Sequence, residues 1–328
     1  MKLTDQTRVK YHLSSPNDFI SNYALFIVLA ALFIFFSVRS PYFFKPANFI
    51  NIFIAVSVVG IVSTAQTTAM IGRGVDLTVG AIAAMAGCMQ AFFVVLHTYP
   101  WYVGMLASAG IGILVGWVNG IIIVKFNLNP FIVTLGMMNV VRGLSFVLVD
   151  GQATFMNNPF LVYLGRERWG GSAPGEGFPV SIVILAISFV VFDFLTKKTV
   201  FGRNVYATGG NVKAARLAGI DTNRVTIILF TIGGFMAAIA GMVIVGISGS
   251  AIPSAAEHVA LDSITAVLLG GTSLAGGSGS VRRTFLGMLI IGIINNGMAL
   301  LNVQTFWQTT AKGALLLAAI MLDAKRKH

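Results

Sequence analysis

The sequence predicts an all-α polytopic membrane protein with about ten transmembrane helices. The first observation is composition: of 328 residues, 56% are hydrophobic and 10% are charged, and the mean hydropathy is +0.85. A chain of this length with so little polarity cannot cover a soluble surface, so lipid must solvate most of it. The second observation is a succession of apolar runs along the whole chain, and the third is that the basic residues lie between those runs.

The apolar runs give the expected spans. Crossing about 30 Å of hydrocarbon takes roughly 20 helical residues, and fewer where neighbouring helices bury the ends. The first run lacks a small-residue cleavage pattern before Arg39, so we expect a retained span and not a signal peptide. We expect one membrane domain over residues 1–328, with spans at 23–38, 47–71, 76–97, 101–124, 130–149, 179–196, 225–248, 263–276, 284–302 and 306–322.

The distribution of basic residues orients the chain. With the N-terminal tail 1–22 in the cytoplasm, sixteen of the 22 Lys and Arg residues fall on the inner side. Both termini are then cytoplasmic, and the longest external loop is 150–178. Its Gly and Pro residues and its charged triplet suit contact with an external partner, through Arg166, Glu167 and Arg168. Topology therefore explains the net charge of +11, which does not indicate nucleic-acid binding.

The longest cytoplasmic loop, 197–224, carries six basic residues against one acid, Asp221. Within it, Asn211 is a suitable N-cap and Gly219 a suitable C′ residue, so we expect a helix of about two turns between them. A short capped helix between two spans indicates a docking element. The alternative is a simple anchor for the positive-inside rule, although charge alone would satisfy topology without a capped helix.

Glycine interrupts two of the expected spans. The third begins GRGVDLTVG at 72–80, and the eighth runs into GGTSLAGGSG at 270–279. Short, Gly-interrupted segments at corresponding positions of two five-span halves are typical of discontinuous helices beside a transport pathway, and an odd number of spans per half makes the repeat inverted. Small residues at four-residue spacing in the fourth and seventh spans instead predict close helix packing: Gly112, Gly116, Gly120, Gly233, Ala237 and Gly241.

Few polar side chains fall within the spans. A carboxylate at a helix start caps free amides, so Asp76 has either that role or a substrate or gating role. Arg142 lies about 18 Å from the cytoplasmic end of its span and is either a structural anchor or a pathway residue. Lys312 is expected to snorkel to the outer interface. Intramembrane asparagines bind a neighbouring helix or a hydroxylated ligand. The candidate pathway or gating residues are Asp76, Thr78, Asn139, Arg142, Asp262, Asn295 and Asn296.

Catalytic signatures are missing from the sequence. It has no phosphate-binding loop of the G-x-x-x-x-G-K-[ST] type and no H-E-x-x-H motif, its four histidines are isolated, and Cys88 is its single cysteine. We therefore expect no enzyme activity, no metal and no cofactor in this chain. An intramembrane enzyme would also need a nucleophile and a base. Transport energy must come from another chain or from an ion gradient.

Several segments carry a family resemblance. The stretches at 72–80, 119–125 (NGIIIVK), 130–143 (PFIVTLGMMNVVRG), 201–220, 261–279 and 295–303 (NNGMALLNV) resemble, in order and over nearly the whole chain, the inner-membrane permeases of bacterial ABC importers for ribose and related monosaccharides. The resemblance implies a second permease copy or a paralogue, cytoplasmic ATPases that hold ATP and Mg, a periplasmic sugar-binding protein and a sugar substrate. It also implies a coupling helix that meets the ATPase, formed by Gly210, Asn211, Val212, Lys213, Ala214, Ala215, Arg216, Leu217, Ala218, Gly219 and Ile220.

The chain departs from the family pattern at a few positions. Thr78 stands for the usual serine, and Arg73 replaces a small residue before that motif. Val259-Ala260 stands where a Tyr-Glu pair is common, and Arg283 replaces a glycine. The main alternative function is an ion-coupled secondary transporter of a small polar solute. Such a transporter typically needs a buried titratable pair in mid-membrane, and Arg142 has no acid in its own span.

Overall fold

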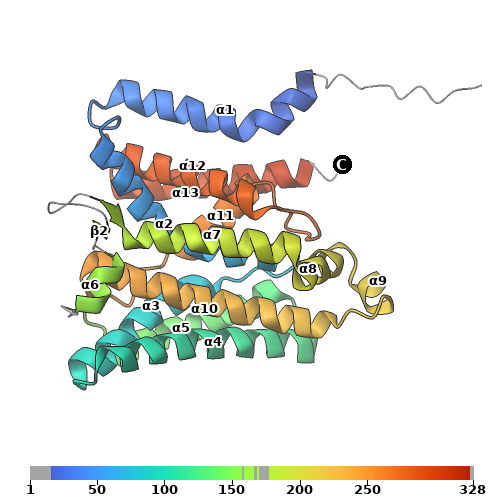
Figure 1. The fold of residues 1–328 in the computed structure, drawn as a ribbon, viewed down its shortest axis with the longest axis horizontal. Helices are drawn as coiled ribbons and strands as arrows, with labels where there is room; N and C mark the ends of the chain where they lie inside the picture. Colours follow the sequence, from blue (N-terminus) through green and yellow to red (C-terminus); the bar gives the residue numbers. More distant parts are fainter. Residues whose placement is uncertain (1–15, 157–158, 166–167, 170–176, 326–328) are drawn as a thin grey trace, which may run out of the picture.

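The computed structural model describes residues 16–156, 159–165, 168–169 and 177–325, and helices dominate them (Figure 1). Among the described residues, seven helices are long and apolar enough to cross a membrane. They are α2 (Pro46–Ile71), α3 (Thr78–Gln90) continued by the π-helix η1 (Ala91–Leu96), α4 (Trp101–Phe126), α5 (Pro130–Leu148), α7 (Val180–Lys198), α10 (Thr222–Ser248) and α12 (Val281–Leu300). The chain is thus an all-α polytopic membrane protein.

Three further helices coincide with the remaining expected spans: α1 (Pro16–Arg39), α11 (Val259–Leu269) and α13 (Thr305–Lys325). The prediction for the eighth span, 263–276, was wrong in its bounds. The helix α11 begins at Val259 and ends at Leu269, and residues 270–280 form a turn-rich loop before α12. At 1.5 Å per residue, eleven residues reach about 17 Å, roughly half of the hydrocarbon thickness. The expectation of an interrupted helix is therefore confirmed here.

The bundle is built around α10, which packs against α2, α3, α4 and α6 (Pro159–Gly165). The small residues predicted to allow close packing do so: a Cβ added at Gly116 would lie 2.2 Å from the Phe230 carbonyl oxygen of α10. The main apolar core joins residues of α2, α3, α10 and α12, among them Ile61, Ala83, Ala237 and Met288. Lipid supplies no hydrophobic drive between helices, so such close backbone contact is what holds the bundle together.

Short strands close the end of the bundle that carries α6 (Figure 1). Strand β1 (Thr154–Phe155) pairs antiparallel with β4 (Ser250–Ala251), and β2 (Arg168–Trp169) pairs antiparallel with β3 (Phe178–Pro179). The β1–β4 pair fixes the chain where it leaves α10. After β4, the non-helical residues 252–258 lead to the start of the half-length α11.

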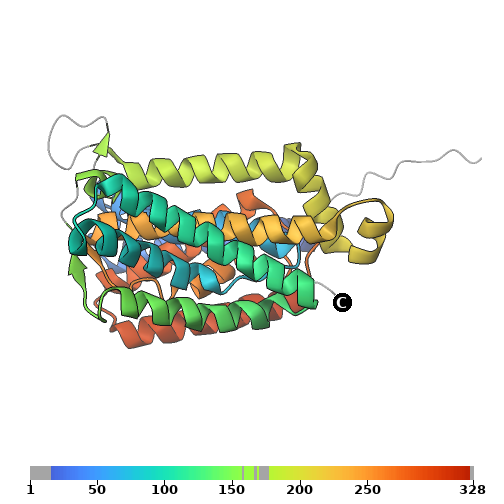
Figure 2. The ribbon, with the colours of Figure 1, turned by 90° about the horizontal axis from the view of Figure 1, so that it is seen from below.

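The opposite end carries the polar segment predicted as a single short helix. It contains two helices, α8 (Val200–Gly210) and α9 (Val212–Leu217), and α9 projects beyond the spans at the end where α13 also ends (Figures 1 and 2). Helix α8 was not predicted, because the two glycines at its C-terminal end, Gly209 and Gly210, are typical of a helix break. Thr199 caps α8 by accepting from the Gly202 N–H, 3.1 Å away.

Candidate functional site

A cavity of about 320 Å³ lies between α3, α5, the start of α11 and the non-helical residues before it. Gly80 of α3 allows the loop to approach, since a Cβ there would lie 2.6 Å from the Ala256 carbonyl oxygen. Most of the residues that line the cavity are apolar, and Arg142 and Glu257 are the charged ones. The full lining consists of Leu77, Gly80, Ala81, Ala84, Phe131, Leu135, Met138, Arg142, Pro253, Glu257, Ala260 and Leu261. An apolar cavity with a few polar groups has the general character of a small-molecule site.

Arg142 of α5 forms an ion pair with Glu257, and the two side chains remain 46% and 38% exposed. The sequence analysis noted the arginine and missed its partner, which comes from the loop before α11. Glu257 is one of only 11 acidic residues in the chain, and its position just before an apolar run is the signal that could have identified it. A charge pair this exposed within a bundle of apolar spans must face water or another protein chain.

Asn139 lies one turn before Arg142 on the exposed side of α5. Its side-chain amide donates to the Leu135 carbonyl oxygen at 3.0 Å, so its own helix satisfies that donor. Helix α5 is the least buried of the seven apolar spans, with 17% of its apolar window covered. Its open face therefore carries both apolar and polar side chains beside the cavity.

A buried polar network lies behind the cavity, at the start of α3. One Asp76 oxygen accepts from the Thr78 N–H (2.8 Å) and from the Thr78 hydroxyl (2.5 Å), and Asn119 of α4 donates to that hydroxyl at 3.1 Å. The Gln66 side-chain amide, turned toward the Asp76 backbone, accepts from its N–H at 3.2 Å and donates to its carbonyl at 3.3 Å. The expected bond from Asp76 to a free amide at the helix start is confirmed, and neither Asp76 nor Thr78 lines the cavity.

The other candidate pathway residues lie elsewhere. Asp262 of α11 accepts from the Lys312 ammonium of α13 at 2.9 Å, beside Asn295 around a pocket of about 10 Å³. The prediction that Lys312 snorkels was wrong, because this buried carboxylate holds it inside the bundle. Asn296 of α12 exchanges two hydrogen bonds with Asn48 of α2, at 3.0 and 2.9 Å. These residues join helices within the described structure and do not reach the main cavity.

The segment predicted to dock a partner has the expected caps. The Asn211 side chain accepts from the Ala214 N–H at 3.1 Å, and Gly219 adopts the left-handed conformation with φ +82°. Asp221 caps α10 by accepting from the Arg224 N–H at 3.0 Å. Between these caps Leu217 is 91% exposed. The tip of α9 thus offers an apolar side chain among basic ones.

The predicted external contact residues are only partly described. Arg166 and Glu167 lie outside the described residues, and Arg168 begins strand β2. This strand lies at the end of the bundle opposite α9 (Figure 1).

Comparison with known proteins places the chain. Residues 48–322 match the model of a family described as the permease component of the branched-chain amino acid transport system. The ribose import permease protein RbsC of Bacillus subtilis (strain 168) is 37% identical over 305 residues, covering 92% of each chain. The RbsC of Escherichia coli (strain K12) is 36% identical over 301 residues, 92% of this chain and 93% of the relative. The L-arabinose ABC transporter permease protein AraH of Azospirillum brasilense is 35% identical over 309 residues, 94% of this chain and 89% of the relative.

No solved structure matches the chain. The family match covers nearly all of the seven apolar spans, the segment 210–220 and both glycine-interrupted segments, and the relatives are 35–37% identical over more than nine tenths of this chain. The chain therefore belongs to this family of membrane-embedded transport permease components.

Proposed function

We propose that the chain forms the translocation pathway of an ATP-driven importer for a monosaccharide or a similar small polar molecule in a bacterial inner membrane. Relatives that cover nearly the whole chain are named for ribose and L-arabinose. The observation that carries the proposal is the cavity of about 320 Å³ beside α5, which is of a size to hold a small solute and has one charged pair at its wall. Ten spans in two inverted five-span halves form its scaffold, with α1, α11 and α13 added to the seven long apolar helices.

The pathway lies on the open face of α5, where a second copy or a paralogue completes it. Arg142 and Glu257 satisfy each other's charge while leaving donors and acceptors for water and sugar hydroxyls. A neutral solute needs only such weak contacts to pass, since tight binding would slow release. Asp76, Thr78 and Asn119 hold the start of α3 behind the wall, so they fix the shape of the cavity without entering it.

Coupling to ATP takes place at α9. Residues Gly210–Ile220 present the exposed Leu217 between basic side chains at the end of the bundle, which suits insertion into a groove of a cytoplasmic ATPase. ATP and Mg bind to that partner, and this chain needs no cofactor of its own. Both termini then lie in the cytoplasm, and a periplasmic sugar-binding protein docks at the opposite end, where Arg168 begins strand β2.

An ion-coupled transporter is the second candidate, and one observation favours it. Arg142 has no acid in its own span, as the sequence indicated, but Asp262 and Lys312 form a largely covered ion pair between α11 and α13. Against it stands the L-arabinose relative, whose name describes an ABC transporter permease. The pair also joins α11 to α13 away from the main cavity.

Uptake of labelled ribose and arabinose into cells distinguishes an ATP-driven importer from an ion-coupled transporter. The permease is expressed with its ATPase and binding protein, without the ATPase, or with an ATPase whose phosphate-loop lysine is replaced. We expect uptake only with active ATPase and continued uptake when ionophores collapse proton and sodium gradients.

A Gly219→Val variant tests the role of α9, because a β-branched residue resists the left-handed conformation. The variant should insert normally and lose uptake. Uptake by the permease alone would overturn the proposal.

A further inference from the structure

Helix α8 is fastened to the first glycine-interrupted segment by Arg73. This residue follows the end of α2 and adopts a left-handed backbone conformation with φ +68°. Its Nε donates to the Gly209 carbonyl oxygen at 2.7 Å and its Nη2 to that of Gly210 at 3.0 Å. These are the last carbonyls of α8, which lack partners inside the helix and carry its partial negative charge. A guanidinium binds such a pair more strongly than a neutral donor does.

The same place brings three backbone segments into direct contact. A Cβ at Gly209 would lie 1.7 Å from the Ile71 carbonyl oxygen at the end of α2. That oxygen also accepts from the Gly277 N–H at 2.8 Å, in the second glycine-interrupted segment. The end of α8 therefore cannot shift without moving the ends of both interrupted segments.

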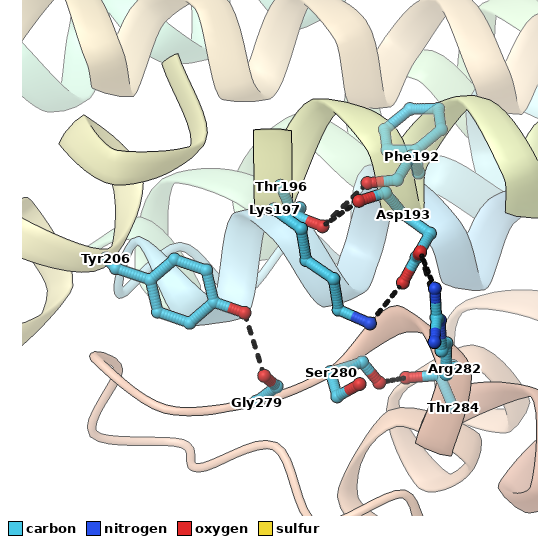
Figure 3. Close-up of polar contacts among 9 residues, drawn as sticks. All are labelled: Phe192, Asp193, Thr196, Lys197, Tyr206, Gly279, Ser280, Arg282 and Thr284. Atoms are coloured by element: carbon cyan, nitrogen blue, oxygen red, sulfur yellow. Dashed lines mark hydrogen bonds and ion pairs between the residues drawn. The ribbon is translucent and has the colours of Figure 1, made fainter. Parts of the chain in front are cut away.

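A second fastening joins α8 to the segment before α12 (Figure 3). The Tyr206 hydroxyl donates to the Gly279 carbonyl oxygen at 2.8 Å. Burial, with the charge of Asp193, raises the pKa of Tyr206, so it stays a donor at neutral pH. On the other side of that segment, Asp193 of α7 forms an ion pair with Lys197 at 2.6 Å and another with Arg282, whose Nη2 and Nε lie 2.9 and 3.0 Å from one carboxylate oxygen.

From these contacts we propose that Arg73 is a positioning residue that transmits displacement of α8 and α9 to the start of α3. Tyr206 transmits the same displacement of α8 to the segment before α12, through its hydrogen bond to Gly279. Three residues after Arg73 comes Asp76, whose hydrogen bonds fix the first turn of α3 and thus one wall of the cavity. The inference rests on the proposed function, since the displacement originates in the ATPase.

The test compares Arg73→Ala, Arg73→Lys and Tyr206→Phe in the complete transporter. The matched control is Lys125→Ala, which removes an exposed cation near the C-terminal end of α4. We expect Arg73→Ala to keep its ATPase and its hydrolysis rate while sugar transported per ATP falls about tenfold, as the loss of two charge-assisted hydrogen bonds implies. Arg73→Lys should recover only part of the lost transport per ATP. Its ammonium keeps the charge but lacks the planar guanidinium that binds both carbonyl oxygens. Tyr206→Phe should have a smaller effect.

Unchanged transport per ATP in Arg73→Ala overturns the inference, and so does loss of the ATPase or of thermal stability in parallel with transport, which marks a merely structural role. Hydrogen exchange of the purified permease gives a readout that does not depend on transport. Arg73→Ala should speed exchange at least about tenfold both at 74–78 and at 207–212, whereas Lys125→Ala should not. Faster exchange in α8 alone contradicts the link, and a wild-type complex that hydrolyses ATP without moving sugar contradicts only the proposed function.

Discussion

Two ion pairs beside α11, Arg142–Glu257 and Asp262–Lys312, differ in how far the protein covers them. The side chains of the first are 46% and 38% exposed, and those of Asp262 and Lys312 are 9% and 24% exposed. Both involve α11 or the residues just before it, so the same short helix separates a covered pair from an open one. An open pair can contact a solute or a second chain, while a covered one can only hold helices together.

Burial changes what each pair contributes to stability. Removing one member of a covered pair leaves the other charge without a partner, whereas an exposed pair contributes little because solvent screens it. If this difference holds, substitutions at the covered pair unfold the bundle and substitutions at the open pair leave it folded and impair transport. Each prediction below tests one side of that contrast.

The largest effect is expected for Lys312→Met, which leaves the Asp262 carboxylate unpaired between α11 and α13. We expect the free energy of unfolding to fall by about 3 kcal/mol, because the carboxylate is left buried without its partner. Thermal unfolding in detergent measures the change, with the exposed Lys125→Met as control. The double variant Lys312→Met with Asp262→Asn should recover most of the loss. A single variant as stable as wild type would show that solvent already reaches Asp262.

A smaller effect on stability, but a larger one on transport, is expected for Arg142→Gln. The exposed pair contributes about 1 kcal/mol or less, so the melting temperature should change by a few degrees at most. Uptake should fall, because Glu257 then lies unpaired at the cavity wall. Exchanging the two charges, with Arg142→Glu and Glu257→Arg together, should restore part of the uptake. If Arg142→Gln unfolds the protein as Lys312→Met does, the two pairs have the same structural role.

Local signals made much of the fold predictable. The caps Asn211 and Gly219 depend on the few residues around them and adopt the expected geometry, and Asp76 binds the Thr78 N–H from one position before the N-cap Leu77. The eighth span was misplaced because its predicted range ran past Leu269 into the glycine-rich residues 270–276, whereas the helix ends where Gly270 packs closely against Thr284 of α12. Helix α8 was missed because its two final glycines read as a break, although Gly209 serves close contact with Ile71.

The pairing of distant charges could not be predicted in the same way. Arg142 and Glu257 are 115 residues apart in sequence, and Asp262 and Lys312 are 50 apart. Whether an arginine or lysine snorkels or pairs depends on which helix lies beside it, and that is decided by packing over the whole bundle. Sequence reasoning could name the charged residues but not their partners.

The smallest effect on the free energy of unfolding is expected for Gly143→Ala, next to Arg142. Comparison with Gly287→Ala contrasts the open face of α5 with the packed face between α11 and α12. A Cβ at Gly143 meets nothing within 4 Å, whereas one at Gly287, where α12 packs on α11, lies 2.1 Å from the Ala266 carbonyl oxygen. Gly143→Ala should therefore stabilise the isolated chain by about 0.5–1 kcal/mol, because alanine favours helix, while Gly287→Ala should destabilise it. Thermal unfolding compares them. Should Gly143→Ala instead separate two permease chains, measured by light scattering, the face beside Arg142 is packed against a partner backbone and is not open to water.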